Sequence, residues 1–208
     1  MIYKYKNMRI YYESHLDGDG RLVYPGFLGV IKEKIGRVNS IHEAFAGAAF
    51  IGFSLLADEM CEKLILSDIE KECIECCKKT VMENNLEDKT SLYQSNCLEQ
   101  IPNQEWDLVV GNPPHFSEHQ GNLPQTDLIT VDTNWDIHRK FYRNIGKYLK
   151  PMGSTILVEN GRGSSPEVFD DMIKEGGLRT ADILKCEVGR PSKFYFIWAK
   201  KISKLNNF

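Results

Sequence analysis

The sequence contains few of the features that would place a protein in a membrane or on a polyanion. No apolar run among its 208 residues is long enough to span a bilayer, and residues 1–6 lack the apolar stretch of a signal peptide. We therefore expect a cytoplasmic protein without a membrane partner. Basic residues do not outnumber acidic ones. The chain has 26 Lys and Arg against 29 Asp and Glu, and the net charge of −3 gives no overall positive field that would attract nucleic acid.

The six cysteines do not show the paired spacing of a zinc site. Cys73, Cys76 and Cys77 lie close together, but the apolar pattern places them inside one helix, and no second pair follows at zinc-finger spacing. Thiols stay reduced in a cytosolic compartment. We expect ordinary reduced thiols and no bound metal, with a cysteine-ligated metal as the alternative.

Predicted strands and helices alternate along the chain. The strands fall at residues 40–43, 63–67, 90–94, 106–111, 154–159, 181–188 and 194–200, and the helices at 24–34, 50–62, 70–84, 136–149 and 166–175. This order predicts an α/β fold with a doubly wound, mostly parallel sheet, in which the last two strands form a hairpin-like pair. The length fits one domain, so we divide the chain into an N-terminal extension, residues 1–39, and a main domain, residues 40–208.

The turn after the strand at 106–111 is the most informative feature. Pro113 and Pro114 remove two backbone donors, so the chain must leave the sheet at the strand's carboxyl end, where open α/β sheets bind ligands. The Asn112 side-chain carbonyl and the Pro113 backbone carbonyl lack obligatory local partners, and two adjacent acceptors suit an –NH2 group. The turn therefore predicts chemistry on an amide or an amino-substituted base. A proline-rich turn with Asn as a cap is the structural alternative.

Other small or polar segments follow the earlier strands. The small residues from Ala44 to Gly52 let the backbone approach a ligand, although they do not keep the Gly-x-Gly-x-x-Gly spacing. Asp68 ends the next strand about 20 residues further on, where an acid can accept both hydroxyls of a ribose or cap the next helix. Asn96 follows the third strand. These segments all meet at the carboxyl edge of the predicted sheet.

The order of these residues resembles that of the class I S-adenosylmethionine-dependent methyltransferases with an Asn-Pro-Pro-aromatic motif. The residues that carry the resemblance are Glu43, Gly47, Gly52, Asp68, Asn96 and Asn112-Pro113-Pro114-His115. Such enzymes include the release-factor glutamine methyltransferases and the N6-adenine methyltransferases of DNA and RNA. The resemblance covers about residues 40–160 and extends loosely to 200. It implies a Rossmann-like methyltransferase fold with seven strands and S-adenosylmethionine as the cofactor over their carboxyl edge.

The resemblance also implies a role for each matching residue. The cofactor-binding residues would be Glu43, Ala46, Gly47, Ala48, Gly52, Asp68 and Asn96, and the catalytic ones Asn112, Pro113, Pro114 and His115. Asp68 would hold the ribose hydroxyls, while Asn112 and Pro113 would orient the target nitrogen. Substrate contacts are expected from Phe116, from His15 in a segment that could cover the cofactor, and from Glu159 at the end of a later strand.

Three positions depart from the family's pattern. Ala49 stands where glycine is usual, so the loop is expected to lie farther from the cofactor. Asn96 replaces an aspartate, which should weaken cofactor binding. His115 replaces Tyr, Phe or Trp, and an imidazole can stack, hydrogen-bond or titrate. Removal of the proton after transfer could fall to His115, Glu13 or Asp132.

The predicted function is S-adenosylmethionine-dependent methylation of an amide or amino nitrogen. A protein side-chain amide or a small molecule is favoured as the acceptor, because the acidic balance and the acidic residues of 116–134 disfavour phosphate contacts. The N6 nitrogen of adenine in RNA or DNA is the alternative acceptor. The alternative from another class is a non-catalytic cofactor-binding module, which the three departures favour and the intact Asn112 turn opposes.

Overall fold

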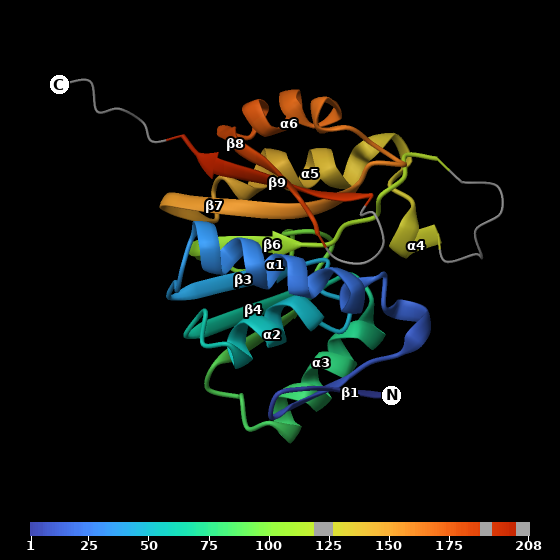
Figure 1. Cartoon of the computed structure of the whole chain (residues 1–208), viewed down its shortest axis with the longest axis vertical. Coiled ribbons are helices and arrows are strands. Elements are labelled where there is room, and N and C mark those ends of the chain that lie inside the picture. The colour runs from blue at the N-terminus through green and yellow to red at the C-terminus, as the bar shows by residue number, and fades with distance from the viewer. Residues whose placement is uncertain (119–126, 188–192, 203–208) are drawn as a thin grey trace.

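The computed structural model describes residues 1–118, 127–187 and 193–202. At its centre is a seven-stranded sheet in the order β5-β4-β3-β6-β7-β9-β8 (Figure 1). The strands are β3 (Ser40–Ala44), β4 (Lys63–Asp68), β5 (Thr90–Gln94), β6 (Trp106–Gly111), β7 (Leu149–Asn160), β8 (Leu178–Lys185) and β9 (Phe194–Lys201). The run from β5 to β7 is parallel, and β9 is antiparallel to both of its neighbours. The predicted doubly wound, mostly parallel sheet is confirmed.

Two hydrophobic cores cover the two faces of the sheet. The helices α1 (Gly20–Lys34), α2 (Phe50–Ala57) and α3 (Lys71–Glu83) pack on one face, and α5 (Asp136–Ile145) and α6 (Asp170–Glu175) pack on the other (Figure 1). Strand residues alternate between the cores. In β6, Leu108 and Val110 belong to the first core and Val109 to the second. Burial on both faces explains why the central strands read as continuous apolar runs.

The N-terminal segment packs along the first core. The strands β1 (Ile2–Tyr5) and β2 (Met8–Tyr11) form an antiparallel hairpin, in which Ile10 is fully buried. The Tyr11 N–H donates to Thr80 Oγ1 on α3 at 2.9 Å, which holds β2 against that helix. A 3-10 turn, Ser14–Leu16, then leads to α1. This route brings residues 16–20 over the strand ends at the carboxyl edge of the sheet.

Several predicted boundaries differ from the structure. Helix α1 begins at Gly20 rather than at residue 24; its N-cap residue is Asp19, and the Arg21 N–H in its first turn donates a hydrogen bond to Asp17 Oδ1. Helix α2 ends at Ala57 rather than at 62, and α5 at Ile145 rather than at 149. The helix predicted at 166–175 is divided into a 3-10 turn, Pro166–Val168, and α6. Strand β7 is longer than predicted and β8 begins earlier.

The segment predicted as an irregular loop, 116–134, contains two short helical turns. These are α4 (Asp127–Thr130) and a 3-10 turn, Thr133–Trp135, while residues 119–126 lie outside the described ranges. None of the helices in the described ranges combines the length and the apolar content needed to cross a bilayer.

Candidate active site

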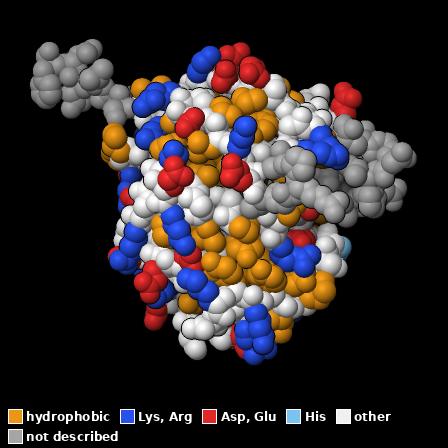
Figure 2. All heavy atoms as spheres, in the orientation of Figure 1, with side chains coloured by type: hydrophobic (Ala, Val, Ile, Leu, Met, Phe, Trp, Pro, Cys, Tyr) orange, Lys and Arg blue, Asp and Glu red, His pale blue; other side chains and the backbone are white. Residues whose placement is uncertain are grey.

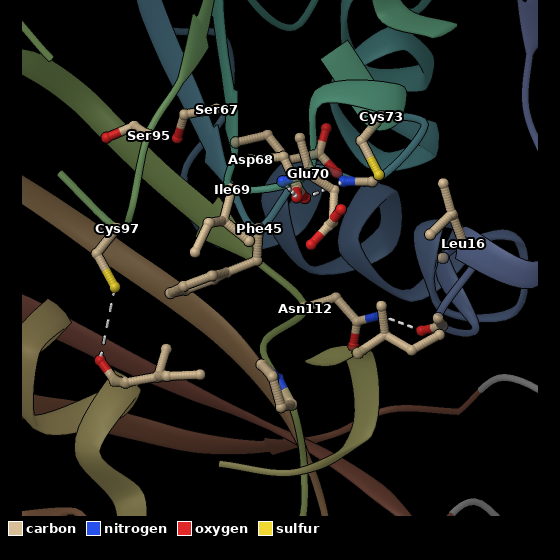
Figure 3. Close-up of a pocket in the computed structure, with 18 of the residues that line it drawn as sticks. Leu16, Phe45, Ser67, Asp68, Ile69, Glu70, Cys73, Ser95, Cys97 and Asn112 are labelled. Atoms are coloured by element: carbon tan, nitrogen blue, oxygen red, sulfur yellow. Dashed lines mark hydrogen bonds between the residues drawn. The ribbon is translucent and has the colours of Figure 1, made fainter. Parts of the chain in front are cut away.

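A pocket lies over the carboxyl ends of β3, β4, β5 and β6 (Figure 3). The turns that follow these strands form one side of it, and residues 16–20 of the N-terminal segment close the other side. Ile129 and Ile137 contribute an apolar wall beyond β6. This is the edge at which the sequence predicts the ligand site, and the position agrees with the rule for open α/β sheets.

The loop between β3 and α2 has a strained backbone. Phe45, Gly47 and Ala49 have positive φ angles of 55°, 52° and 58°. This left-handed conformation suits glycine, whereas it costs other residues about 1–2 kcal/mol each. The three alternate residues turn the chain tightly around the pocket, and only one of them is glycine. Strain of this kind is typical of functional loops.

Glu43 supports this loop from the end of β3. Its side chain lines the pocket but is 1% exposed as a residue, and its Oε2 accepts a hydrogen bond from the Gly52 N–H at 2.6 Å. Burial raises the pKa of Glu43 well above its usual value. A Cβ at Gly52 would lie 2.6 Å from the same oxygen. The Gly52 backbone therefore contacts the Glu43 carboxyl group directly, and only a residue without a side chain fits at this position.

Asp68 ends β4 and connects two backbone segments of the pocket. Its Oδ2 accepts a hydrogen bond from the Gly47 N–H at 2.8 Å, and its Oδ1 accepts one from the Glu70 N–H at 2.9 Å. Burial raises the pKa of Asp68, and the backbone hydrogen bonds oppose that shift. The carboxylate therefore faces the pocket and also fixes the chain before α3 (Figure 3).

The segment after β5 forms the next wall. Ser95, Asn96 and Cys97 all line the pocket. The Asn96 backbone N–H donates to the Gln100 side chain at 2.7 Å, and Cys97 has a positive φ of 53°. The turn is thus fixed by local hydrogen bonds and places Asn96 on the wall of the pocket.

Asn112 lines the pocket, and the N-terminal segment fixes the orientation of its side-chain amide. Its Nδ2 donates a hydrogen bond to the Gly18 carbonyl of the N-terminal segment (Figure 3). The amide orientation is therefore fixed, because the reverse orientation would place two oxygens against each other. Asn112 Oδ1 is buried and has no partner among the described residues. A buried acceptor without a partner is rare and indicates a place for a ligand's N–H group.

The charges of the pocket indicate what kind of ligand it suits. The acidic residues Asp17, Asp68 and Glu70 line it together with Glu43, whose pKa is raised by burial, and the described lining residues include no Lys, Arg or His. A pyrophosphate would be repelled by such a set, whereas a ligand with a cationic centre and hydroxyl donors would be stabilised. The residues therefore fit S-adenosylmethionine, which carries a sulfonium, an ammonium group and ribose hydroxyls.

The structure brings some of the predicted site residues to this pocket and leaves others outside it. Those that line it are Glu43, Ala46, Gly47, Asp68, Asn96, Asn112 and Pro114. Those that do not line it are Ala48, Gly52, Pro113, His15, His115, Phe116 and Glu159. His15 is on the surface, with its Nε2 3.4 Å from the Glu72 carboxylate. Phe45, Glu70 and Ile137 also line the pocket, although the sequence did not predict them as site residues, because only strand pairing shows that these positions share one edge.

His115 and Glu159 belong instead to a buried group behind the Asn112 turn. Asp132 Oδ2 lies 2.6 Å from His138 Nδ1, and His138 Nε2 lies 3.0 Å from Glu159 Oε1. We call Asp132, His138 and Glu159 the ionic chain. His115 extends it, with its Nδ1 3.7 Å from Glu159 Oε2. The sequence indicated His115, Glu159 and Asp132 only separately, as candidates for catalysis, substrate contact or proton removal, and gave no sign that they meet around His138.

Comparison with known proteins identifies the family. The model of the methyltransferase small domain family matches residues 28–178. This chain belongs to that family. The family match confirms the resemblance to class I S-adenosylmethionine-dependent methyltransferases. It also supports S-adenosylmethionine as the cofactor of this chain.

Curated relatives match part of the chain. The bifunctional methyltransferase of Rickettsia typhi is 28% identical over 147 residues, which are 66% of this chain and 28% of the relative. The release factor glutamine methyltransferase of Aquifex aeolicus is 23% identical over 55% of this chain and 44% of its own length. The chain thus spans less than half of either relative.

Solved structures share the fold at low sequence identity. A 16S rRNA N2 G1207 methyltransferase of T. thermophilus, solved with AdoMet and guanosine, has a TM-score of 0.62 at 17% identity. The match covers 86% of this chain and 43% of the neighbour's chain. An S-adenosylmethionine-dependent methyltransferase of Clostridium acetobutylicum has a TM-score of 0.64 at 12% identity, and covers 88% of this chain and 92% of its own. These matches confirm the Rossmann-like methyltransferase fold.

Proposed function

We propose that this methyltransferase small domain uses S-adenosylmethionine to methylate the side-chain amide nitrogen of a protein. The observation that carries the proposal is the fixed, unpaired Oδ1 of Asn112 at the edge of an acidic pocket. Glu43, Asp68, Glu70 and Asn96 would hold the cofactor, which supplies an electrophilic methyl group on a sulfonium.

The chain's part in the reaction is mainly to position the acceptor. An amide nitrogen is a weak nucleophile because its lone pair is delocalised into the carbonyl. Asn112 Oδ1 and the Pro113 carbonyl would accept hydrogen bonds from its two N–H groups, which favours a pyramidal nitrogen and frees the lone pair. Correct placement of a nucleophile can provide about 7–11 kcal/mol. Fixed acceptors add electrostatic stabilisation, because the nitrogen becomes positive as it reacts.

A protein amide is favoured over adenine by the relatives and by the surface charge. Three of the curated relatives are named as glutamine methyltransferases. Those of Aquifex aeolicus and Shewanella oneidensis are named for release factors, and that of Bordetella pertussis for ribosomal protein uL3. On the face that Figure 2 shows, acidic and basic side chains are interspersed and form no continuous basic band, which a nucleic-acid surface on that face would need. An acceptor in the translation machinery would place the enzyme in the cytoplasm.

Adenine in RNA or DNA is the second candidate acceptor. The T. thermophilus structural neighbour is named as a 16S rRNA N2 G1207 methyltransferase, so it supports an RNA base amine as an acceptor, although its base is guanine. A non-catalytic module is the third, and Asn112 distinguishes it from the enzyme. A binding module does not need a fixed hydrogen-bond acceptor beside the cofactor pocket, so replacing that side chain should not abolish its function.

The test is transfer of tritium from methyl-labelled S-adenosylmethionine into fractions of a cell extract. We expect label in the protein fraction, and a loss of about 100-fold or more with Asn112→Ala, which is the usual cost of removing one group from a preorganised polar site. Asn144→Ala, on α5 away from the pocket, is the matched control and should retain activity. Asn144→Ala should bind the cofactor as the unmodified protein does, and Asn112→Ala should lose far less cofactor affinity than turnover, because on the binding side it removes only the hydrogen bond to Gly18. Label in RNA would favour the second candidate, and no label with intact cofactor binding would favour the module.

A further inference from the structure

Residues 16–20, which we call the strap, form the side of the pocket opposite the turns that follow the strands. Within the strap, Gly18 and Asp19 have positive φ angles of 52° and 64°. Two successive residues in the left-handed region turn the chain sharply before α1. At this turn the Gly18 carbonyl accepts the hydrogen bond that the Asn112 Nδ2 donates (Figure 3). The strap therefore touches the side chain on which the proposed reaction depends.

Arg21, the residue directly after the strap, holds it in place. Its Nε donates to Asp17 Oδ2 at 2.6 Å, and its backbone N–H donates to Asp17 Oδ1 at 3.2 Å. An exposed ion pair alone would contribute little. The same guanidinium, however, also donates from Nη1 to the Tyr12 hydroxyl at 3.1 Å and lies 4.6 Å from the centre of the Tyr12 ring. Arg21 thus closes the loop of residues 12–21 at its base.

The strap also packs against the loop between β3 and α2. A Cβ added at Gly20 would lie 3.3 Å from Cδ2 of Phe50, and one added at Gly47 would lie 3.2 Å from the Leu16 carbonyl oxygen. Phe50 is 2% exposed and begins α2, so it offers a rigid support. The position of the strap is therefore set by the fold on one side and by the Arg21 side chain on the other.

Asn112 needs a partner that distinguishes the two ends of its amide. A half-turn about the last side-chain bond exchanges oxygen and nitrogen with almost no change of shape. Only one of the two orientations leaves Oδ1 as an acceptor for a substrate N–H group. The Gly18 carbonyl selects this orientation, because it accepts from Nδ2 and would repel Oδ1. Oδ1 has no partner among the described residues, so the selection depends on the strap.

We infer that Arg21 and Asp17 are positioning residues of the transfer reaction, which hold the strap so that the Gly18 carbonyl orients Asn112. The inference rests on the proposed function, since it needs an acceptor nitrogen at Asn112. Arg21 is not among the residues that line the pocket, so its influence on the reaction passes through the strap. The alternative is that the ion pair of Arg21 and Asp17 only stabilises the first turn of α1.

The first test reads the Asn112 amide directly, without cofactor or acceptor. Side-chain ¹H–¹⁵N spectra contain the Nδ2 signals, and Asn112→Ala identifies them. In the unmodified protein we expect one of the two N–H resonances to be shifted downfield and to exchange slowly with water, because it donates to Gly18. Arg21→Ala should move the pair toward the values of a free amide. The matched control is Arg37→Ala, which removes an exposed arginine paired with Glu62 at 3.2 Å and should leave the signals unchanged.

The second test measures the maximal rate at saturating labelled S-adenosylmethionine, with the extract's protein fraction as acceptor. Arg21→Ala should lower this rate about two- to tenfold, the usual worth of one hydrogen bond. Arg21→Lys keeps the charge but not the planar fork, so its rate should fall between the two. In the Asn112→Ala background, Arg21→Ala should cause no further loss. Arg37→Ala should keep the full rate.

The third test reverses the demand on the strap. Asn112→Asp places a stronger acceptor at the site but has no N–H for the Gly18 carbonyl, whose oxygen would repel the carboxylate. We expect this variant to lose most of its turnover. Adding Arg21→Ala should restore part of it, because the released strap can move away from the carboxylate. If Arg21 only stabilises α1, the second substitution adds to the first loss.

The outcomes separate the inference from the proposed function. Free-amide signals in the unmodified protein, or full turnover of Asn112→Asp, would overturn the inference even if Arg21→Ala does not fold. Amide signals that Arg21→Ala leaves unchanged, or an equal loss of rate with and without the Asn112 side chain, would also overturn it. In each case the proposed function stands. No transfer by the unmodified protein would overturn both.

Discussion

The stability of the protein should fall as the pH rises above neutral, because His138 loses its proton. The pKa of His138 is raised to about 9 by Glu159 and Asp132, against about 6.5 for histidine in an unfolded chain. Between these values the folded state binds more protons than the unfolded state. The stabilisation is therefore fully present below pH 6.5 and is lost as the pH approaches 9. The shift corresponds to about 3 kcal/mol as an upper limit.

Thermal unfolding between pH 6.5 and 8.5 measures this loss. For a chain of this size each 1 kcal/mol shifts the midpoint by about 2–4 °C, so we expect a decrease of several degrees. His138→Gln keeps a polar side chain but cannot titrate, and its midpoint should be lower at pH 6.5 and nearly flat over the same range. An equal decrease of the unfolding midpoint in His138→Gln would show that other groups cause the effect, such as cysteines that ionise in the unfolded chain. No decrease in the unmodified protein would refute the charged state of His138.

Three other predictions address the core and the pocket. Burial lowers the pKa of His42 to about 3, so acid should destabilise the protein progressively below pH 6.5, and His42→Phe should reduce this effect in urea unfolding. Gly52→Ala places a Cβ 2.6 Å from Glu43 Oε2 and should destabilise the protein by about 1–3 kcal/mol. The control is Gly29→Ala on α1, where the added Cβ meets no atom within 4 Å and should stabilise the protein by up to about 1 kcal/mol. Asp68→Asn should weaken S-adenosylmethionine binding by about tenfold or more in calorimetry, since charge-assisted hydrogen bonds contribute about 1.5–3 kcal/mol, and unchanged affinity would exclude the ribose role.

The strands were predictable where turn signals enclose a short apolar run. The strands at 90–94 and 106–111 have the predicted bounds, because polar residues and prolines end each one sharply. The start of α1 was missed, because the glycines and acids of residues 17–20 are typical of a loop, whereas in the structure Asp17 accepts a hydrogen bond from the first turn of the helix. Local patterns do not show whether a polar cluster ends one element or begins the next.

The site was predictable where its residues follow strand ends in order. Glu43, Asp68, Asn96 and Asn112 reach one pocket because parallel strands present their carboxyl ends at the same edge. The ionic chain could not be predicted in this way. Its members come from a loop, a helix and a strand, and their contacts depend on how α5 packs against β7, which no sequence spacing records.

The fixed Asn112 amide also depends on a long-range contact. Its partner is the Gly18 carbonyl, 94 residues earlier in the chain. The sequence indicated that residues 11–20 could cover the pocket, but it gave no reason to expect them to orient the side chain at the Asn-Pro-Pro turn. This contact makes the N-terminal segment part of the candidate active site.

The most direct test of the central claim is the chemical nature of the transferred methyl group. Protein labelled with tritiated S-adenosylmethionine would be hydrolysed in acid, which breaks a side-chain amide. We expect the label to be released as volatile methylamine and Asn112→Ala to abolish this release. Label that stays on an amino acid after hydrolysis, or that does not depend on Asn112, would contradict amide methylation at this site.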